Sequence, residues 1–309
     1  MKICFLGAGS LGSTIGGTLS EGGSDVYLID QWREHVDAMN RDGLAISEGG
    51  AERVVRVKAQ IGTSGLGFMD LVIVLVKSFH TREAVSAAEN VIGPDTTVMS
   101  LQNGLGNEEV IAGIVGAERV VGGKTYVGGG IAGPGRVSAG VKGKLTVIGE
   151  MDGGKTERIR RIAEEFERSG LRTEISENIV GMIWDKLLVN VATAAVTSIT
   201  RLTYGELYRM EELAETAQSA VAEAVAVAAA NGVRLDTCDP AEVWRRASAG
   251  LPADFKTSML LGLERGIKSE IDFINGAVVR YGERVQVPTP VNRTLAACVK
   301  GIERALGLA

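Results

Sequence analysis

Short uninterrupted runs of apolar residues recur through the first half of the chain, and residues 71–76 form the clearest of them. Such a run is typical of a strand buried on both faces, as in a parallel sheet that is covered by helices. Further strands are expected at residues 25–29 and 97–101, and residues 11–19 have the spacing of a helix. This alternation predicts an α/β region over residues 1–175.

Two segments depart from this simple alternation. Residues 44–47 and 54–61 are separated by Gly49 and Gly50, and we expect them to form a hairpin inserted into the same sheet layer. Residues 120–148 are rich in Gly and Val, and we expect them to supply antiparallel strands at one edge.

After residue 175 the pattern changes to long segments with helical spacing of apolar residues. Gly232, Gly250 and Gly282 are placed to end three of these helices. An all-α region is therefore expected over residues 176–309. The predicted helices cover residues 179–199, 206–231, 240–249, 270–281 and 290–305.

The composition is that of a globular protein. A chain of 309 residues is long enough for two domains with separate cores. Hydrophobic residues make up 45%, charged residues 23%, and the net charge of −5 offers no basic surface for nucleic acid. The run at 71–76 is too short to span a bilayer, and no signal-peptide pattern precedes the first strand. We expect a soluble protein without a nucleic-acid or membrane partner.

Cysteine and histidine are scarce. Cys4, Cys238 and Cys298 are far apart and form no C-x-x-C pair, which argues against disulfides and structural zinc and favours the cytoplasm. His35 and His80 are the only histidines, and we expect each on the surface or along the side of a helix. A histidine-based triad or metal centre therefore has very few possible members.

The glycine motif near the N-terminus is the most informative chemical signal. It has the form G-x-G-x-x-G and directly follows an apolar strand. Such glycines allow a tight turn, close approach of backbone to a pyrophosphate, and close packing of the next helix. An acidic residue ends the second strand, 18 residues after the last glycine, where it can bind ribose hydroxyls. We predict a dinucleotide site, rather than a purely structural turn, formed by Gly7, Ala8, Gly9, Ser10, Leu11, Gly12 and Asp30.

Two polar residues follow strands at the sheet edge where ligands of doubly wound folds bind. Lys77 comes after residues 71–76, and Asn103 lies in a Gly-rich turn after residues 97–101. The alternative is that Lys77 is a solvated strand end and Asn103 a turn former. Their position makes both residues candidates for the site.

Lys186 and Asn190 lie four residues apart and hence on one face of a predicted helix. Leu187 and Leu188 indicate that this helix is buried, and a buried lysine is costly unless it loses its proton or meets an anion. Either condition suits a general acid that faces a carbonyl oxygen and a substrate carboxylate. An ion pair with a glutamate elsewhere is the alternative.

Glu270 is a third candidate. Ser269 and Asp272 have the spacing of a capping box, which places Glu270 in the first turn of a predicted helix. A carboxylate there is favoured by the helix dipole and stays ionised, and this effect alone can explain the residue. Its occurrence together with the other candidate motifs favours a functional role.

Six motifs together resemble the ketopantoate reductase family, the 2-dehydropantoate 2-reductases. They are residues 7–12, 76–77, 103–106, 184–190, 256–259 and 269–276. The resemblance runs nearly end to end. It implies a Rossmann-type dinucleotide-binding domain followed by an all-α domain like the C-terminal domain of 6-phosphogluconate dehydrogenase. It also implies NAD(P)H as cofactor and pantoate, a precursor of pantothenate and coenzyme A, as product.

The resemblance also implies roles for individual residues. Lys186 is then the general acid that protonates the ketone, and Glu270 engages the substrate hydroxyl. The residues expected to bind substrate are Asn103, Asn190, Ser258 and Lys77, of which Lys77 and Asn103 also contact the cofactor.

Two positions depart from the family pattern. Ala194 stands one turn beyond Asn190, where the family often has a second asparagine, and the lost hydrogen bond suggests another 2-oxo acid or an imine as substrate. Asp30 repels a 2′-phosphate and favours NADH, although Arg33 can still attract that phosphate. A non-catalytic dinucleotide-binding protein is a further alternative. The long apolar helices of the second region suit a homodimer.

Overall fold

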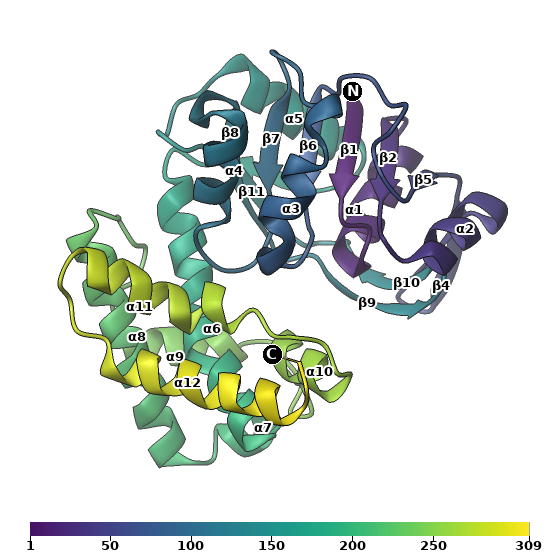
Figure 1. Ribbon diagram of the computed structural model, residues 1–309. Coiled ribbons are helices and arrows are strands. Elements are labelled where there is room, and N and C mark those ends of the chain that lie inside the picture. Colours follow the sequence, from purple (N-terminus) through teal and green to yellow (C-terminus); the bar gives the residue numbers. More distant parts are fainter. Residues whose placement is uncertain (309) are drawn as a thin grey trace. The chain divides into compact units, whose positions relative to one another are not determined.

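The computed structural model describes residues 1–308, apart from the side chain at position 139. The chain divides into two compact units, both of which can be followed by colour in Figure 1. The first unit contains residues 1–102 and 107–179, and the second contains residues 103–106 and the chain from Val180 onward. The division thus comes a few residues after position 175, and a short turn from the first half belongs with the second unit.

An eight-stranded sheet forms the centre of the first unit. Its order is β12-β11-β8-β7-β6-β1-β2-β5, and its neighbouring strands are parallel except for β8 and β11. The strands are β1 (Lys2–Leu6), β2 (Asp25–Ile29), β5 (Lys58–Gln60), β6 (Leu71–Val74), β7 (Thr97–Ser100), β8 (Val120–Thr125), β11 (Thr146–Glu150) and β12 (Thr173–Ile175). From β1 the sheet first extends in one direction, through β2 to β5. The next strand, β6, then lies on the opposite side of β1. Ligands of such sheets bind at the carboxyl ends of the strands beside this switch point.

Each face of the sheet has its own hydrophobic core. On β1, Ile3 and Phe5 belong to one core, whereas Cys4 and Leu6 belong to the other. All four side chains are buried, which explains why the strand reads as an uninterrupted apolar run. The α-helices of this unit are α1 (Ser10–Glu21), α2 (Arg33–Asp42), α3 (Thr81–Ser86), α4 (Asn107–Val115) and α5 (Glu157–Arg168). Short 3₁₀ helices are η1 (Ser78–His80), η2 (Glu89–Val91) and η3 (Ala117–Arg119).

A second, four-stranded sheet has the order β4-β3-β10-β9. Its strands are β3 (Leu44–Glu48), β4 (Ala51–Val55), β9 (Gly128–Gly133) and β10 (Arg136–Gly140). The predicted hairpin is present as β3 and β4, but its assignment to the main sheet was wrong because β3 pairs with β10 instead. The predicted second strand also ends early: β4 stops at Val55, and β5 returns to the main sheet.

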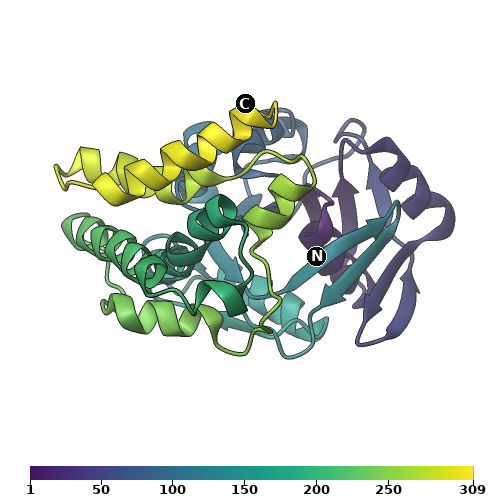
Figure 2. The same cartoon turned by 90° about the horizontal axis from the view of Figure 1, so that it is seen from below.

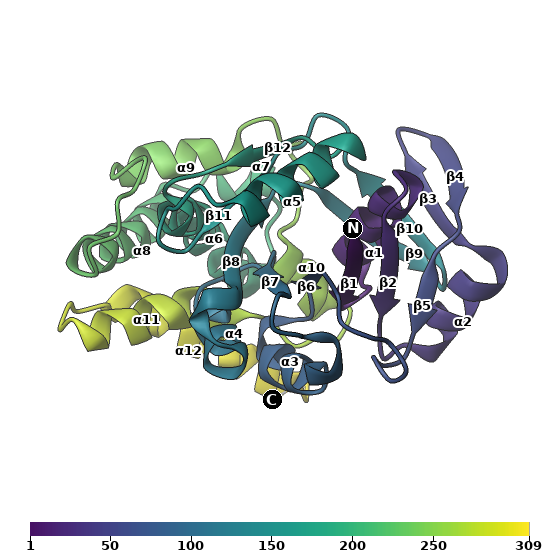
Figure 3. The same ribbon diagram turned by 90° about the horizontal axis from the view of Figure 1, so that it is seen from above.

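Helix α1 lies between the two sheets, as the labels of α1, β9 and β10 in Figure 3 indicate. Two consecutive glycines allow this packing. A Cβ atom on Gly16 would lie 2.5 Å from the side chain of Leu28 in the main sheet. A Cβ atom on Gly17 would lie 2.8 Å from Ile46 in the second sheet. The helix that follows the glycine motif is therefore in close contact on both sides.

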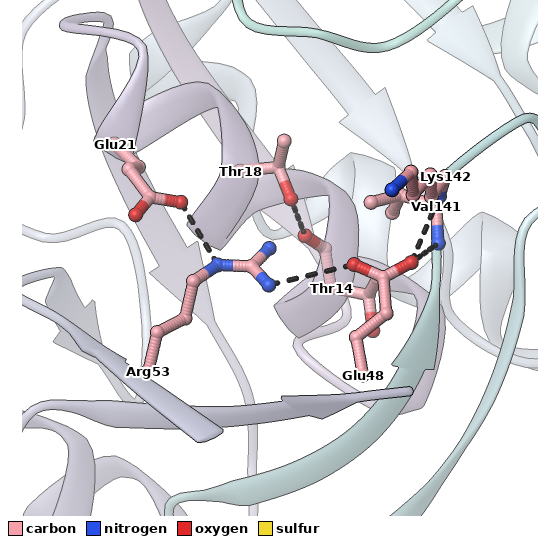
Figure 4. Close-up of polar contacts among 7 residues, drawn as sticks. All are labelled: Thr14, Thr18, Glu21, Glu48, Arg53, Val141 and Lys142. Atoms are coloured by element: carbon pink, nitrogen blue, oxygen red, sulfur yellow. Dashed lines mark hydrogen bonds and ion pairs between the residues drawn. The ribbon is translucent and has the colours of Figure 1, made fainter. Parts of the chain in front are cut away.

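Ionic contacts also connect α1 to the four-stranded sheet (Figure 4). Arg53 donates to Glu21 of α1 at 2.9 Å and to Glu48 at 3.5 Å. The other carboxylate oxygen of Glu48 accepts the backbone N–H groups of Val141 and Lys142 at 2.7 and 2.8 Å. Burial by itself would raise the pKa of Glu48, but the two N–H groups and Arg53 outweigh burial and lower that pKa. This carboxylate therefore links β3 to the segment after β10 and to Arg53 of β4, which in turn contacts α1.

The second unit is helical. Its elements are α6 (Ile179–Thr200), α7 (Tyr204–Leu207), α8 (Glu211–Ala230), α9 (Pro240–Ser248), α10 (Ser258–Glu264), η4 (Ile271–Phe273), α11 (Asn275–Arg284) and α12 (Pro290–Ala305). Helices α11 and α12, which lie toward the yellow end of the colour scale in Figure 2, are side by side. The expected fold class, α/β followed by all-α, is confirmed. The predicted helix at residues 206–231 is divided into α7 and α8.

Among residues 1–308, only α6 is long and apolar enough to cross a membrane, with a mean hydropathy of 1.5 over its most apolar stretch. Within that stretch 67% of the residues are buried inside the protein. Buried apolar helices of this length are common as core helices, and α6 has that position in the second unit.

Candidate active site

The glycine turn between β1 and α1 leaves no room for side chains at two positions. Gly7 has φ +103°, and a Cβ atom there would lie 2.6 Å from the backbone nitrogen of Val76. A Cβ atom on Gly12 would lie 1.9 Å from the carbonyl oxygen of Gly7. Both glycines are therefore required for the chain to fold back against β1 and β6.

Gly9 differs from the other two glycines. Its φ of −62° suits any residue, and a Cβ atom would meet no described atom within 4 Å. None of the described side chains caps the N-terminus of α1, and the buried Oγ of Ser10 has no hydrogen-bond partner within the described residues. Open space, a helix N-terminus and an unused hydroxyl fit the pyrophosphate of a dinucleotide.

The structure brings Asp30 to the same turn. The backbone N–H groups of Gly7 and Ala8 both donate to the carbonyl of Ile29, at 2.9 and 3.1 Å. Asp30 follows at the end of β2 and is half-buried, and its Oδ1 accepts the backbone N–H of Trp32 at 3.0 Å. This hydrogen bond orients the carboxylate beside the glycine turn, as binding of a ribose hydroxyl requires.

The side chain of His35 contacts the backbone of the glycine turn at Ala8, which the sequence did not predict. His35 lies on helix α2, one of the two positions expected for it, but its ring is completely buried, whereas His80 is exposed. Nδ1 of His35 accepts the N–H of Gly135 at 2.9 Å, so the neutral ring carries its proton on Nε2, 3.1 Å from the carbonyl of Ala8. Burial lowers the pKa of His35, against the opposing charge of Asp30, and favours this neutral form.

Lys77 lies at the sheet edge that carries the glycine turn. Strand β6 ends at Val74, two residues earlier than predicted, and Leu75 N–H still donates to Leu6 of β1 at 2.8 Å. The chain then passes Gly7 and reaches Lys77, whose side chain is exposed at the start of η1. The structure therefore brings Lys77 and the glycine turn together at the carboxyl ends of β1 and β6.

Asn103 is grouped with the second unit rather than with the glycine turn. The turn that holds it is anchored at Leu105, whose N–H donates to the carbonyl of Phe273 at 2.8 Å. Gly104 has φ +86°, and a Cβ atom there would lie 2.4 Å from the same carbonyl. This packing brings half-buried Asn103 close in structure to the segment that begins with Glu270.

The helix that was predicted to begin at Glu270 does not begin there. Residues 271–273 form η4, and α11 starts only at Asn275, because Ile274 has φ −110° and ψ −99° and interrupts the helix. The Ser269 hydroxyl accepts the N–H of Ile271 instead of closing a capping box. Glu270 is half-buried and stands at the N-cap of the three-residue η4, so its predicted position in the first turn of a long helix was wrong.

Helix α6 carries Lys186 and Asn190 one turn apart, as predicted from their spacing. Both side chains are half-buried, so the lysine is less buried than the apolar residues around it suggested. Leu187 and Leu188 between them are buried, which fixes the orientation of the helix. The neighbouring Asp185 accepts the backbone N–H of Asp236 at 3.2 Å and holds a loop.

The same helix is tied to the segment that carries Ser258. Ala194 and Thr197 continue the face of α6 that begins with Lys186, and both are buried. The hydroxyls of Thr197 and Thr257 are 2.8 Å apart, and Thr257 caps α10 by accepting the N–H of Leu260. Ser258 is the first residue of α10 and is exposed. The second unit thus gathers Lys186, Asn190 and Ser258 on connected elements.

Glu108 is a buried carboxyl that sequence reasoning missed. It lies in the first turn of α4 with 8% of its surface exposed. Burial raises the pKa of Glu108 to about 7, and the hydrogen bond with the side chain of Ser100 does not compensate. The only sequence signal was a glutamate beside an apolar helix, which normally indicates an exposed position.

The raised pKa of Glu108 predicts a pH-dependent stability. The protonated form stabilises the fold fully below about pH 4.5, the ordinary value, and this contribution is lost as the pH rises to about 7. The unfolding free energy of the natural protein minus that of Glu108→Gln should therefore fall between pH 5 and 7, by at most about 1.4 kcal/mol per pH unit. Urea unfolding at pH 5, 6, 7 and 8 measures this difference. His35 is present in both proteins, so its opposite titration cancels, and a flat difference would contradict the assignment.

Within residues 1–308, no group of three or more His, Cys, Asp or Glu side chains is arranged to hold a metal ion.

Two family models match the chain. Residues 3–153 match the model described as ketopantoate reductase PanE/ApbA, and residues 178–303 match that of its C-terminal domain. Curated relatives named 2-dehydropantoate 2-reductase include one from Pyrococcus horikoshii, 38% identical over 98% of both chains. Another, from Archaeoglobus fulgidus, is 35% identical over 99% of both chains.

Solved structures resemble the chain over nearly its full length. A PanE/ApbA family ketopantoate reductase from Ralstonia eutropha has a TM-score of 0.91 and 34% identity, and covers 99% of this chain and 100% of its own. A D-mandelate dehydrogenase in ternary complex with NADH and anilino(oxo)acetate has a TM-score of 0.92 and 28% identity, with the same coverage.

Proposed function

The chain belongs to the ketopantoate reductase family, and we propose that it reduces 2-dehydropantoate to pantoate with NAD(P)H. It is an NAD(P)-dependent oxidoreductase of the class that acts on CH–OH groups. The observation that carries the substrate proposal is the full-length identity of 38% to a 2-dehydropantoate 2-reductase. The position of Lys186 and Asn190 on one face of α6 supports the reaction type.

Lys186 acts as the general acid in this proposal. The reduced nicotinamide, when bound, supplies the hydride to the ketone carbon. Nζ of Lys186 donates a proton to the ketone oxygen, so that the negative charge arising there is neutralised as the C–H bond forms. The half-buried position of Lys186 beside buried leucines supports this role, because electrostatic stabilisation of a developing oxyanion is stronger where contact with water is reduced.

The other polar groups hold the substrate in place. Asn190 lies one turn from Lys186 and donates its amide to the substrate carboxylate, while Ser258 and Asn103 add further hydrogen bonds. Glu270 accepts a hydrogen bond from the substrate hydroxyl, a role that suits a carboxylate. Lys77 contacts both cofactor and substrate. Correct orientation by such contacts accounts for a large part of the rate enhancement in enzymes.

NADH is the proposed cofactor. A carboxylate at the end of β2 accepts hydrogen bonds from the ribose hydroxyls and repels a 2′-phosphate. Asp30 has this position and is oriented by Trp32. Arg33, at the start of α2, is the residue that would counteract the repulsion.

We predict that Asp30→Ser raises kcat/KM for NADPH relative to NADH by about tenfold, because it removes the repulsion. Initial rates with both cofactors at low ionic strength measure the ratio, and added salt should reduce the change. Asp37→Ser is the matched control, since Asp37 is an exposed carboxylate on α2. An equal ratio in the natural protein and Asp30→Ser would exclude Asp30 from cofactor selection.

Reduction of a different 2-oxo acid or of an imine by NADH is the second candidate function. Ala194 on the Lys186 face of α6 cannot supply a hydrogen bond, which favours a substrate with less polar surface there. The similarity to a D-mandelate dehydrogenase solved with NADH and anilino(oxo)acetate supports this second candidate.

Oxidation rates of NADH and NADPH with 2-dehydropantoate, aromatic and aliphatic 2-oxo acids test these proposals together. The highest kcat/KM for 2-dehydropantoate supports the first function, and a much higher value for another acceptor supports the second. Tight NADH binding without turnover of any acceptor would indicate a non-catalytic dinucleotide-binding protein.

We also propose a cellular compartment and an oligomeric state for this enzyme. We place the enzyme in the cytoplasm because Cys4, Cys238 and Cys298 are all free thiols. A homodimer is proposed from the long apolar helices of the second unit, and its molar mass in solution can be measured by light scattering.

A further inference from the structure

We propose that Gln102 is a positioning residue that holds the turn bearing Lys77 at the carboxyl edge of the main sheet. We call residues 76–81 the Lys77 turn. The inference rests on the proposed reductase function, in which Lys77 contacts cofactor and substrate. Gln102 comes from the adjacent strand segment after β7 and acts only through this turn.

The side-chain amide of Gln102 joins both ends of the Lys77 turn. Its Nε2 donates to the carbonyl oxygen of Val76 at 2.8 Å, directly before Lys77. The same nitrogen donates to Oγ1 of Thr81, also at 2.8 Å, at the other end of the turn. One amide group thus uses its two N–H bonds to fix the beginning and the end of the segment.

The surroundings determine the orientation of this amide. The Val76 carbonyl can only accept a hydrogen bond, so the NH₂ group must face it. On the other side, the Ser100 hydroxyl contacts Oε1 of Gln102 at 3.3 Å and accepts the backbone N–H of Gln102 at 3.3 Å. Gln102 and Thr81 are 8% and 1% exposed, so water cannot readily replace these bonds.

The Lys77 turn also has hydrogen bonds within itself, and Oγ1 of Thr81 lies 3.2 Å from Oδ1 of Asn107 in α4. The N–H of His80 donates to the carbonyl of Lys77 at 2.7 Å, and the hydroxyl of Thr81 donates to Ser78 at 2.8 Å. The ladder between β6 and β7 ends with Val74 opposite Ser100. Internal bonds fix the shape of the turn, whereas Gln102 fixes its place relative to the neighbouring strand.

Gln102→Leu removes both donors at nearly constant volume. We expect kcat/KM for the best 2-oxo acid to fall about 30-fold, because displacement of a positioning group by about 1 Å has effects of this order. Amide hydrogen exchange in peptides covering residues 76–81 should also accelerate at least about tenfold. The exchange measurement needs neither substrate nor cofactor.

Thr96→Val is the matched control. Oγ1 of Thr96 is buried and donates to the carbonyl of Met69 at 2.6 Å, joining the same two strand segments at their opposite ends. We expect this variant to lose stability, while kcat/KM and exchange at residues 76–81 remain within about twofold of the natural protein. Equal losses of activity in Thr96→Val and Gln102→Leu would overturn the proposal.

A double variant, Gln102→Leu with Lys77→Ala, tests whether Gln102 affects kcat/KM through Lys77. If Gln102 acts through Lys77, adding Gln102→Leu to Lys77→Ala changes kcat/KM by less than about twofold. A full loss in the Lys77→Ala background would overturn the positioning role. If the unmodified protein reduces no 2-oxo acid, the proposed function fails. The inference about Gln102 is tested separately: unchanged hydrogen exchange at residues 76–81 in Gln102→Leu would overturn it.

Discussion

Lys186→Ala should lower kcat by about 10³-fold while the affinity for NADH changes less than about twofold, because a general acid acts only on the reacting ketone. Loss of proton donation leaves water as the only source of the proton at the ketone oxygen. Stopped-flow or steady-state oxidation of NADH measures kcat, and a fluorescence titration measures cofactor affinity. This is the largest effect expected from a single side chain of the proposed site.

Two further variants separate chemistry from packing. Lys186→Met keeps the length and apolar stem of the side chain, so it should match Lys186→Ala in kcat but retain more stability. Lys155→Ala, at an exposed lysine that pairs with Glu177, should have the same kcat as the unmodified protein. A natural kcat in Lys186→Met would refute the proposed role, since the charged amine is all that this variant lacks.

Gly9→Val should weaken NADH binding at least about 100-fold without lowering the unfolding temperature by more than a few degrees. Gly9 has an ordinary φ, and its Cβ position is free of contacts from described atoms. The added methyl groups therefore cost the folded chain little, but they occupy the space where a pyrophosphate must approach the backbone. Isothermal titration with NADH and thermal unfolding of the same sample measure both quantities.

Gly130→Val is a suitable control because Gly130 also has open space around its Cβ position and lies in β9 of the same unit. It should bind NADH as the natural protein does. Gly12→Ala provides the opposite case, since its Cβ would lie 1.9 Å from a carbonyl oxygen and the fold itself should be destabilised. Normal NADH affinity in Gly9→Val would refute the pyrophosphate assignment.

Local patterns were sufficient to predict the glycine turn and the start of the fold. Gly7, Gly12 and Asp30 belong to one βαβ unit, in which the turn, the helix and the acidic strand end lie close in sequence. The pair Lys186 and Asn190 was predictable for the same reason, because their relation depends only on helical periodicity. The family and its fold class are confirmed by the family models.

Long-range pairing was not predictable in this way. Strand β3 pairs with β10, about 90 residues later, and no local signal distinguishes this partner from the main sheet. The buried position of His35 depends likewise on Gly135, which is 100 residues away. At Glu270, a capping-box pattern was present, but the Ser269 hydroxyl accepts the N–H of Ile271 instead, and Ile274 then interrupts the helix.

The enclosure of α1 has a consequence for the evolution of cofactor affinity. Substitutions in the four-stranded sheet can shift the helix through Gly17 and Ile46 without any contact to the dinucleotide. The distance between the helix N-terminus and an anionic ligand would then change by fractions of an ångström. Affinity can therefore be adjusted gradually from a remote surface, while the glycines that directly line the turn remain fixed by steric exclusion.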